Sequence, residues 1–163
     1  DSDYFGPYNK LHILFPPASD FAVGPAFFQD SPQAPVTAVF EIFLVDKPLL
    51  ILELRVPSYR DLPSTRQVVD EEIRNRMHDM AAVLPLDTLH AISALGTKLC
   101  FYSVDTRCSS AEIVPAAISH HPTEMNDPAP ADRWDCDILE PAGEERLRLT
   151  VNRIMEECAA LNM

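Results

Sequence analysis

Runs of apolar residues divide the chain into predicted strands, and apolar residues three and four positions apart mark its predicted helices. Two runs stand out, 36–45 (VTAVFEIFLV) and 49–56 (LLILELRV), because they are dense in β-branched and aromatic residues. Their nearly continuous apolar character predicts two central strands in a sheet that is covered on both faces. The segment 21–28 (FAVGPAFF) predicts a further strand. Gly24 and Pro25 place this strand at an edge of the sheet, because proline donates no backbone hydrogen bond.

Helices are expected at 8–15, at 64–84 and at about 142–161, where apolar residues recur at helical spacing. The long central helix begins at Ser64. With Gln67 this serine fits a capping box, in which each side chain satisfies a free amide at the start of the helix.

Further strands are expected at 89–95, 98–104, 111–119 and 134–139. The first two form a hairpin around Gly96 and Thr97, and Pro115 limits the third to an edge. The proline-rich acidic segment 120–133 is expected to be a loop. The resulting order, α-β-β-β-α-β-β-β-β-α, predicts a single domain over residues 1–163. Its class is α/β (α+β), with a mixed central β-sheet and flanking helices.

The charge balance limits the partners of the protein. Thirteen lysines and arginines stand against 25 aspartates and glutamates, so the formal net charge is −12. Because attraction to phosphate needs a basic face, this excludes general electrostatic binding of nucleic acid over the whole surface and leaves only a local basic patch. No run approaches the roughly 20 apolar residues of a membrane-spanning helix, so no membrane partner is expected.

The cysteines are widely spaced and form no CxxC pair; they are Cys100, Cys108, Cys136 and Cys158. We interpret them as reduced and mostly buried thiols, which favours an intracellular protein. The chain begins with Asp1 rather than methionine. Loss of a signal peptide, secretion and a disulfide therefore form the alternative. The sequence leaves the oligomeric state open.

Three residues of the two central strands carry chemistry: Glu41, Glu53 and Arg55. We expect a three-residue turn, 46–48, between these strands, because Pro48 has no amide to donate to the ladder. That turn places Glu41 directly opposite Glu53, with Arg55 on the same face and a wholly apolar opposite face. A two-residue turn would send the two glutamates to opposite faces.

Carboxylates that face each other with Cβ atoms roughly 5 Å apart repel, and burial penalises both charges. A cation between them relieves this repulsion, and Mg²⁺ is commonly held by one or two carboxylates and water molecules. Glu41 and Glu53 are therefore candidate metal ligands. The alternative is structural: a partly buried ion pair between Glu53 and Arg55, with Glu41 near the solvent end.

An α-β-β-β-α-β order with an acidic residue on the second strand and ExK on the third resembles the PD-(D/E)xK nuclease-like superfamily. The segment LILELRV looks like the third strand, with Glu53 at the acidic position and Arg55 in place of lysine. The whole chain also resembles uncharacterised proteins abundant in mushroom-forming fungi. This second resemblance is carried by Gly6–Leu11, Leu52–Pro57, Gly96–Tyr102 and Asp132–Pro141.

The nuclease resemblance implies metal-dependent hydrolysis of phosphodiester bonds in DNA or RNA. Glu41 and Glu53 would hold Mg²⁺ or Mn²⁺, which activates water, and Arg55 would contact the scissile phosphate. Gln67 would position water or a phosphate oxygen, unless it serves only the capping box. A local groove for nucleic acid is expected beside Arg55, Arg60 and Arg66.

Two departures from the motif open alternatives. The second strand offers only Glu41 in place of aspartate, and the guanidinium of Arg55 cannot transfer a proton at neutral pH. The site is then weakened, or the chain is a catalytically inactive nuclease-fold protein that only binds a partner. A further alternative is an RNA N-glycosidase of the ribosome-inactivating, toxin-like kind, which needs a carboxylate, an arginine and aromatic surfaces around an extruded base. Glu53, Arg55, Tyr59 and Trp134 would supply that set.

Overall fold

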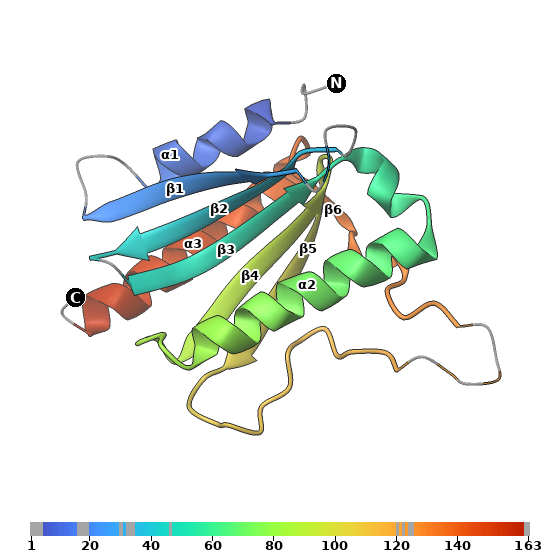
Figure 1. Ribbon diagram of the computed structural model, residues 1–163. Helices are drawn as coiled ribbons and strands as arrows, with labels where there is room; N and C mark the ends of the chain where they lie inside the picture. Colours follow the sequence, from blue (N-terminus) through green and yellow to red (C-terminus); the bar gives the residue numbers. More distant parts are fainter. Residues whose placement is uncertain are drawn as a thin grey trace.

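The computed structural model of the protein describes residues 5–15, 20–29, 31, 35–45, 47–119, 121, 123 and 126–161 (Figure 1). These residues form one α+β domain around a mixed six-stranded sheet with the strand order β1-β2-β3-β4-β5-β6. The expected class and the flanking helices are confirmed. Among the described residues, no helix has both the length and the apolar character to cross a membrane.

The elements follow the predicted order, except that the strand expected at 111–119 is absent. The strands are β1 (Phe21–Phe28), β2 (Thr37–Leu44), β3 (Lys47–Arg55), β4 (Thr88–Leu95), β5 (Lys98–Asp105) and β6 (Cys136–Asp137). The helices are α1 (Leu11–Leu14), α2 (Pro63–Ala81) and α3 (Pro141–Ala160). Short 3₁₀ segments are η1 (Gly6–Lys10), η2 (Pro57–Arg60) and η3 (Ala131–Arg133).

The sheet combines a meander with a crossover. Strands β1, β2 and β3 are antiparallel, and β1 occupies the edge that Pro25 predicted. Helix α2 connects β3 to β4, which run parallel, and β5 returns antiparallel to β4. The tight β4–β5 turn places Gly96 at φ 63°, a conformation that glycine adopts without steric cost.

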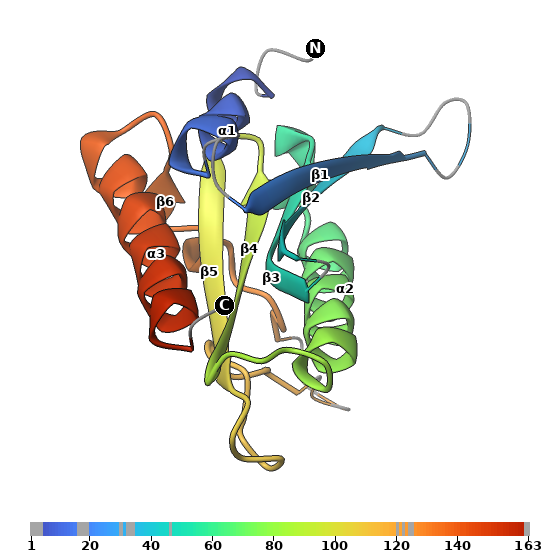
Figure 2. The ribbon, with the colours of Figure 1, turned by 90° about the vertical axis from the view of Figure 1, so that its left-hand side faces the viewer.

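Two hydrophobic cores lie on the two sides of the sheet. Helices α1 and α3 pack on one side, where Leu11 and Ile154 meet the even-numbered residues of β2 and β3. Helix α2 packs on the other side, where Val69 and Ile73 meet Val39. Figure 2 shows α3 and α2 on opposite sides of the strands. Burial on both faces explains why the central strands carry nearly continuous apolar runs.

Some local predictions were wrong. The segment 111–119 is not a strand; only Val114 forms an isolated bridge, to Ser103. Helix α2 begins at Pro63, whose fixed φ suits the first helical position, and no side chain caps it. The capping box of Ser64 and Gln67 is therefore absent. The predicted last strand, 134–139, shrinks to the two residues of β6. Part of the acidic loop 120–133 lies outside the described residues.

The turn between β2 and β3 corrects the predicted register. Leu44 pairs with Lys47, so the turn has two residues, of which Asp46 lies outside the described part. A bulge between Ile42 and Phe43 then shifts the register by one residue. A bulge adds one residue to one strand only, so this shift returns the side chains of β2 and β3 to the faces predicted for them. The two glutamates thus share a face despite a two-residue turn.

The first residue of this turn, Val45, has a φ of 47°. A β-branched residue pays a steric cost in this left-handed region, whereas asparagine tolerates it. Val45 is also 71% exposed, so its side chain contributes little burial. We expect Val45→Asn to raise the free energy of unfolding by about 1 kcal/mol in chemical denaturation. Val83→Asn, at another exposed valine, is the control and should bring no gain. An equal change at both positions would contradict this account of the turn.

Candidate functional site

Glu53 and Arg55 lie on the face of β3 that α2 covers. Side chains alternate along the strand, so Leu52 and Leu54 point into the core under α1 and α3, whereas Ile51 packs toward α2. Glu53 is fully buried, and Arg55 is 9% exposed. The charged pair is thus buried between the sheet and α2. As predicted, its two residues share one face of β3, opposite to the face that carries only apolar side chains.

Two residues of α2 complete this group, and together we call Glu53, Arg55, Glu72 and Arg76 the Glu53 cluster. Arg55 Nε donates a hydrogen bond to Glu53 Oε1 at 3.0 Å, and its Nη2 donates to Glu72 Oε2. Arg76 Nε lies 3.2 Å from Glu53 Oε2, an ion pair without hydrogen-bond alignment. Two carboxylates face two guanidiniums, so the cluster carries no formal net charge.

The pKa shifts in the cluster follow from burial and from these pairs. Burial lowers the pKa of Arg55, but Glu53 and Glu72 outweigh it and raise that pKa above its ordinary value. Burial also raises the pKa of Glu72; Arg55 opposes this effect and Glu53 adds to it. Arg55 therefore stays charged and serves as a counterion rather than as a proton-transfer group.

Glu41 does not face Glu53. It pairs across the ladder with Ile51, whereas Glu53 faces Val39. A diagonal neighbour of this kind lies roughly 7–8 Å away. The predicted direct opposition was wrong, because the turn and bulge displace β3 by two residues from the expected register. Within the part of the chain that the structure describes, no group of three or more His, Cys, Asp or Glu side chains is placed to hold a metal.

Gln67 does not reach the Glu53 cluster by any hydrogen bond of the described residues. Its amide donates to Glu71 Oε1 at 2.8 Å, one turn further along α2. This is an ordinary pair of neighbours on a helix surface. Among the described residues, Gln67 thus takes part neither in a capping box nor in a hydrogen bond to Glu53.

The other two predicted contacts for nucleic acid, Arg60 and Arg66, hold the chain itself. Arg66 is 5% exposed, donates to the carbonyl of Ala129 at 2.8 Å and pairs with Asp127. Arg60 donates to the carbonyl of Ala131 at 3.3 Å. Both guanidiniums thus hold the connection between β5 and β6, Arg66 as a buried residue and Arg60 as a half-buried one.

A second buried cluster, which we call the Asp70 cluster, also fastens this connection. Asp70 accepts hydrogen bonds from Tyr102 at 2.8 Å, from Arg133 at 2.9 Å and from Arg74 at 2.7 Å. The two arginines donate onward to the carbonyls of Pro115 and Ala116, each at 2.7 Å. The cluster ties α2, β5 and the β5–β6 connection together. Its carboxylate is fully occupied by partners.

The aromatic residues of the N-glycosidase alternative do not form a stacking site. Trp134 is fully buried in the core under α2, and its indole donates to Ser93 Oγ at 3.2 Å. Tyr59 lies against the Arg55 guanidinium, 5.6 Å from ring centre to Cζ. With Trp134 enclosed, these two rings do not sandwich an extruded base.

The sequence did not predict the roles of Glu72 and Arg76. Both lie on α2 four residues apart, a spacing that by itself is typical of a pair on a solvated helix face. One signal was available: α2 follows β3 and must pack on it, so helix charges beside the apolar stripe lie close to Glu53. The buried carboxylate required cations, and α2 supplies one of them.

Comparisons with protein-family models, with curated proteins and with solved structures give no significant match.

Proposed function

We propose that this protein is a catalytically inactive, nuclease-like binding or interaction protein. The observation that supports this proposal is the Glu53 cluster: the one fully buried carboxylate of β3 is matched by Arg55 at 3.0 Å and Arg76 at 3.2 Å. In a metal-dependent nuclease this carboxylate would bind Mg²⁺ or Mn²⁺ together with a second acid. Here the guanidiniums of two arginines lie beside Glu53 instead.

Charge and geometry both disfavour a metal at Glu53. Mg²⁺ prefers six oxygen ligands in near-octahedral arrangement. A divalent ion at this place would lie beside two guanidiniums, and its second carboxylate, Glu41, faces Ile51. Binding would require both arginines to leave a buried carboxylate, which costs their ion pairs and hydrogen bonds.

The element order supports the nuclease-like part of the proposal. Helix α1, the β1–β3 meander, α2 and β4 follow one another as in the α-β-β-β-α-β core. Glu53 and Arg55 lie at the carboxyl end of β3, the strand on which that superfamily carries ExK. The fold and the position of its acidic residue are thus retained in this proposal, whereas the metal site is replaced by an ion-pair cluster.

Incubation with single- and double-stranded DNA and RNA tests the proposal. Each substrate is mixed with wild-type protein and Glu53→Gln in Mn²⁺, in Mg²⁺ and in chelator. We expect no strand cleavage and no base release by either protein, because Arg55 and Arg76 pair with the Glu53 carboxylate and the Trp134 ring is enclosed in the core. Glu72→Gln, in the same cluster but partly exposed, serves as the matched control.

Two results would overturn the proposal, and they point to different enzymes. Metal-dependent strand cuts that disappear in Glu53→Gln and persist in Glu72→Gln would establish the nuclease. Release of bases that ignores the chelator and disappears in Glu53→Gln would establish the N-glycosidase.

A further inference from the structure

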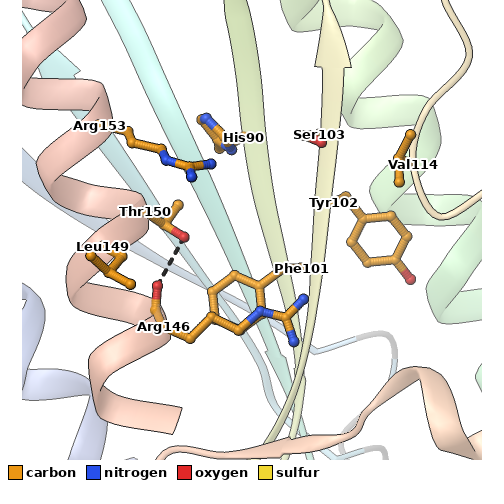
Figure 3. A pocket seen from close by; sticks show the side chains of 9 residues that line it. All are labelled: His90, Phe101, Tyr102, Ser103, Val114, Arg146, Leu149, Thr150 and Arg153. Carbon is orange, nitrogen blue, oxygen red and sulfur yellow. Dashed lines mark hydrogen bonds between the residues drawn. The ribbon is translucent and has the colours of Figure 1, made fainter. Parts of the chain in front are cut away.

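A groove of about 310 Å³ lies on the face of the sheet opposite to the Glu53 cluster. Helix α3 forms one wall, and β4 and β5 form the other (Figure 3). Arg146, Thr150 and Arg153 come from α3, at positions that share one helix face. The strands contribute the side chains of His90 and Phe101. Its volume is in the range of small-molecule sites, which start at about 300 Å³.

The charge of this groove is opposite to that of the protein. The chain has a formal net charge of −12, yet no aspartate or glutamate is among the residues that line the groove, whereas two arginines and a histidine are. Arg146 and Arg153 carry two positive charges on one wall, and His90 faces them from β4. Because acidic side chains prevail elsewhere on the molecule, this basic lining is a local feature that favours an anion.

The basic groups are available to a ligand to different degrees. Among the residues that the structure describes, none forms a hydrogen bond or ion pair with the Arg153 guanidinium. Arg146 stacks on Phe101, with Cζ 4.5 Å from the ring centre, and pairs at 3.2 Å with the exposed Asp135. Burial, and then the charge of Arg153, lower the pKa of His90. His90 is therefore neutral at pH 7 and can donate a hydrogen bond to an anion.

We propose that this groove binds a phosphate monoester of a small organic molecule. Arg153, which pairs with no carboxylate among the described residues, and Arg146, which is partly engaged by Asp135, supply positive charge for the phosphate. The planar fork of a guanidinium also suits phosphate oxygens. Arg153 and His90 contact the phosphate, and Thr150, whose hydroxyl donates a hydrogen bond to the backbone carbonyl of Arg146 at 3.0 Å, lines the same wall (Figure 3). The organic group lies on Phe101 and on Leu149, which is 53% exposed. The proposal is independent of the Glu53 cluster, which lies on the other face of the sheet.

Calorimetric titration with three probes tests the groove at low ionic strength and above pH 7, where phosphate monoesters are mainly dianions. The probes are adenosine 5′-monophosphate, inorganic phosphate and adenosine. We expect the nucleotide to bind most tightly, inorganic phosphate more weakly and adenosine not measurably. Binding of adenosine as tight as that of the nucleotide would overturn the proposal, and so would no binding of either phosphate probe.

A charge-matched pair of variants locates the binding. Arg153→Gln should weaken nucleotide binding about tenfold or more, because it removes a charged hydrogen-bond donor. Arg148→Gln removes the same charge from the same helix at a residue paired with Glu144 outside the groove, and should change affinity less than about twofold. Equal losses in the two variants would show nonspecific attraction and overturn the assignment.

The ring of His90 reports binding directly by NMR. A bound phosphate dianion favours the protonated imidazole, so the pKa of His90 should rise on addition of the nucleotide. It should also rise toward the ordinary 6.5 in Arg153→Gln, where one cause of its depression is gone. An unchanged His90 titration in saturating nucleotide would contradict binding in this groove.

Discussion

Replacing Glu53 with glutamine is expected to lower the free energy of unfolding by about 3 kcal/mol, because breaking a buried ion pair on one side leaves an uncompensated charge. Glutamine keeps the volume of the side chain but removes its negative charge. Arg55, 9% exposed, would then keep Glu72 as its one carboxylate partner among the described residues, and Arg76 would lose its ion pair. Urea denaturation of the two proteins under identical conditions measures the difference.

The same measurement separates a structural carboxylate from one kept for catalysis. A functional acid often costs stability, so its replacement by a neutral residue leaves the protein equally stable or more stable. Glu72→Gln is the control: its side chain is 41% exposed, and the amide oxygen can still accept from Arg55, so the loss should stay below about 1 kcal/mol. A Glu53→Gln protein as stable as wild type would contradict the structural role.

Replacing Asp70 with alanine should cost about 4 kcal/mol, the second large effect. Asp70 is 5% exposed and is the only carboxylate that accepts hydrogen bonds from Arg74 and Arg133 among the described residues. Its loss leaves two buried guanidiniums and the Tyr102 hydroxyl without the carboxylate that accepts their hydrogen bonds. Because these arginines also bind the carbonyls of Pro115 and Ala116, the β5–β6 connection should become more sensitive to proteolysis.

Asp79→Asn provides the control on the same helix. Asp79 is exposed on α2, so its replacement should change the unfolding free energy by no more than about 0.5 kcal/mol. If Asp70→Ala unfolded at the same urea concentration as Asp79→Asn, the Asp70 cluster would not hold the connection in place.

Strands β1 to β5 were predictable from the sequence because their signal is local and strong. Proline and glycine mark β1 as an edge, and β-branched residues fill the central strands. Their register was not predictable in the same way. It depends on a bulge beside Phe43, and no residue type in the sequence indicates this bulge. The turn is one residue shorter than predicted, and the bulge adds one residue to one strand, so Glu41 and Glu53 still lie on the same face.

The candidate site was predictable only in part. Strand alternation predicts that Glu53 and Arg55 lie on the same face. An ion pair between them was one of the two interpretations that the sequence offered. The cations that complete the cluster come from α2, and their approach depends on how the helix lies across the sheet. Arg66 looked like a free basic residue in sequence, yet it is buried because the distant segment around Ala129 folds over it.

The groove on α3 was missed for a related reason. His90 and Arg153 are more than 60 residues apart in the chain, and each alone is an ordinary surface residue type. Only the packing of α3 on the sheet brings them to one cavity.

The most direct test of whether Glu53 pairs with arginines or binds a metal is to measure the unfolding free energy of the wild-type protein with and without Mn²⁺. A bound ion stabilises the folded state in proportion to the logarithm of its concentration over Kd. With Glu41→Gln and Glu53→Gln measured alongside, we predict that Mn²⁺ shifts all three proteins alike, through weak contacts at the acidic surface. A rise with Mn²⁺ that occurs in wild type and is lost in both variants would place a metal between the two glutamates and contradict the account.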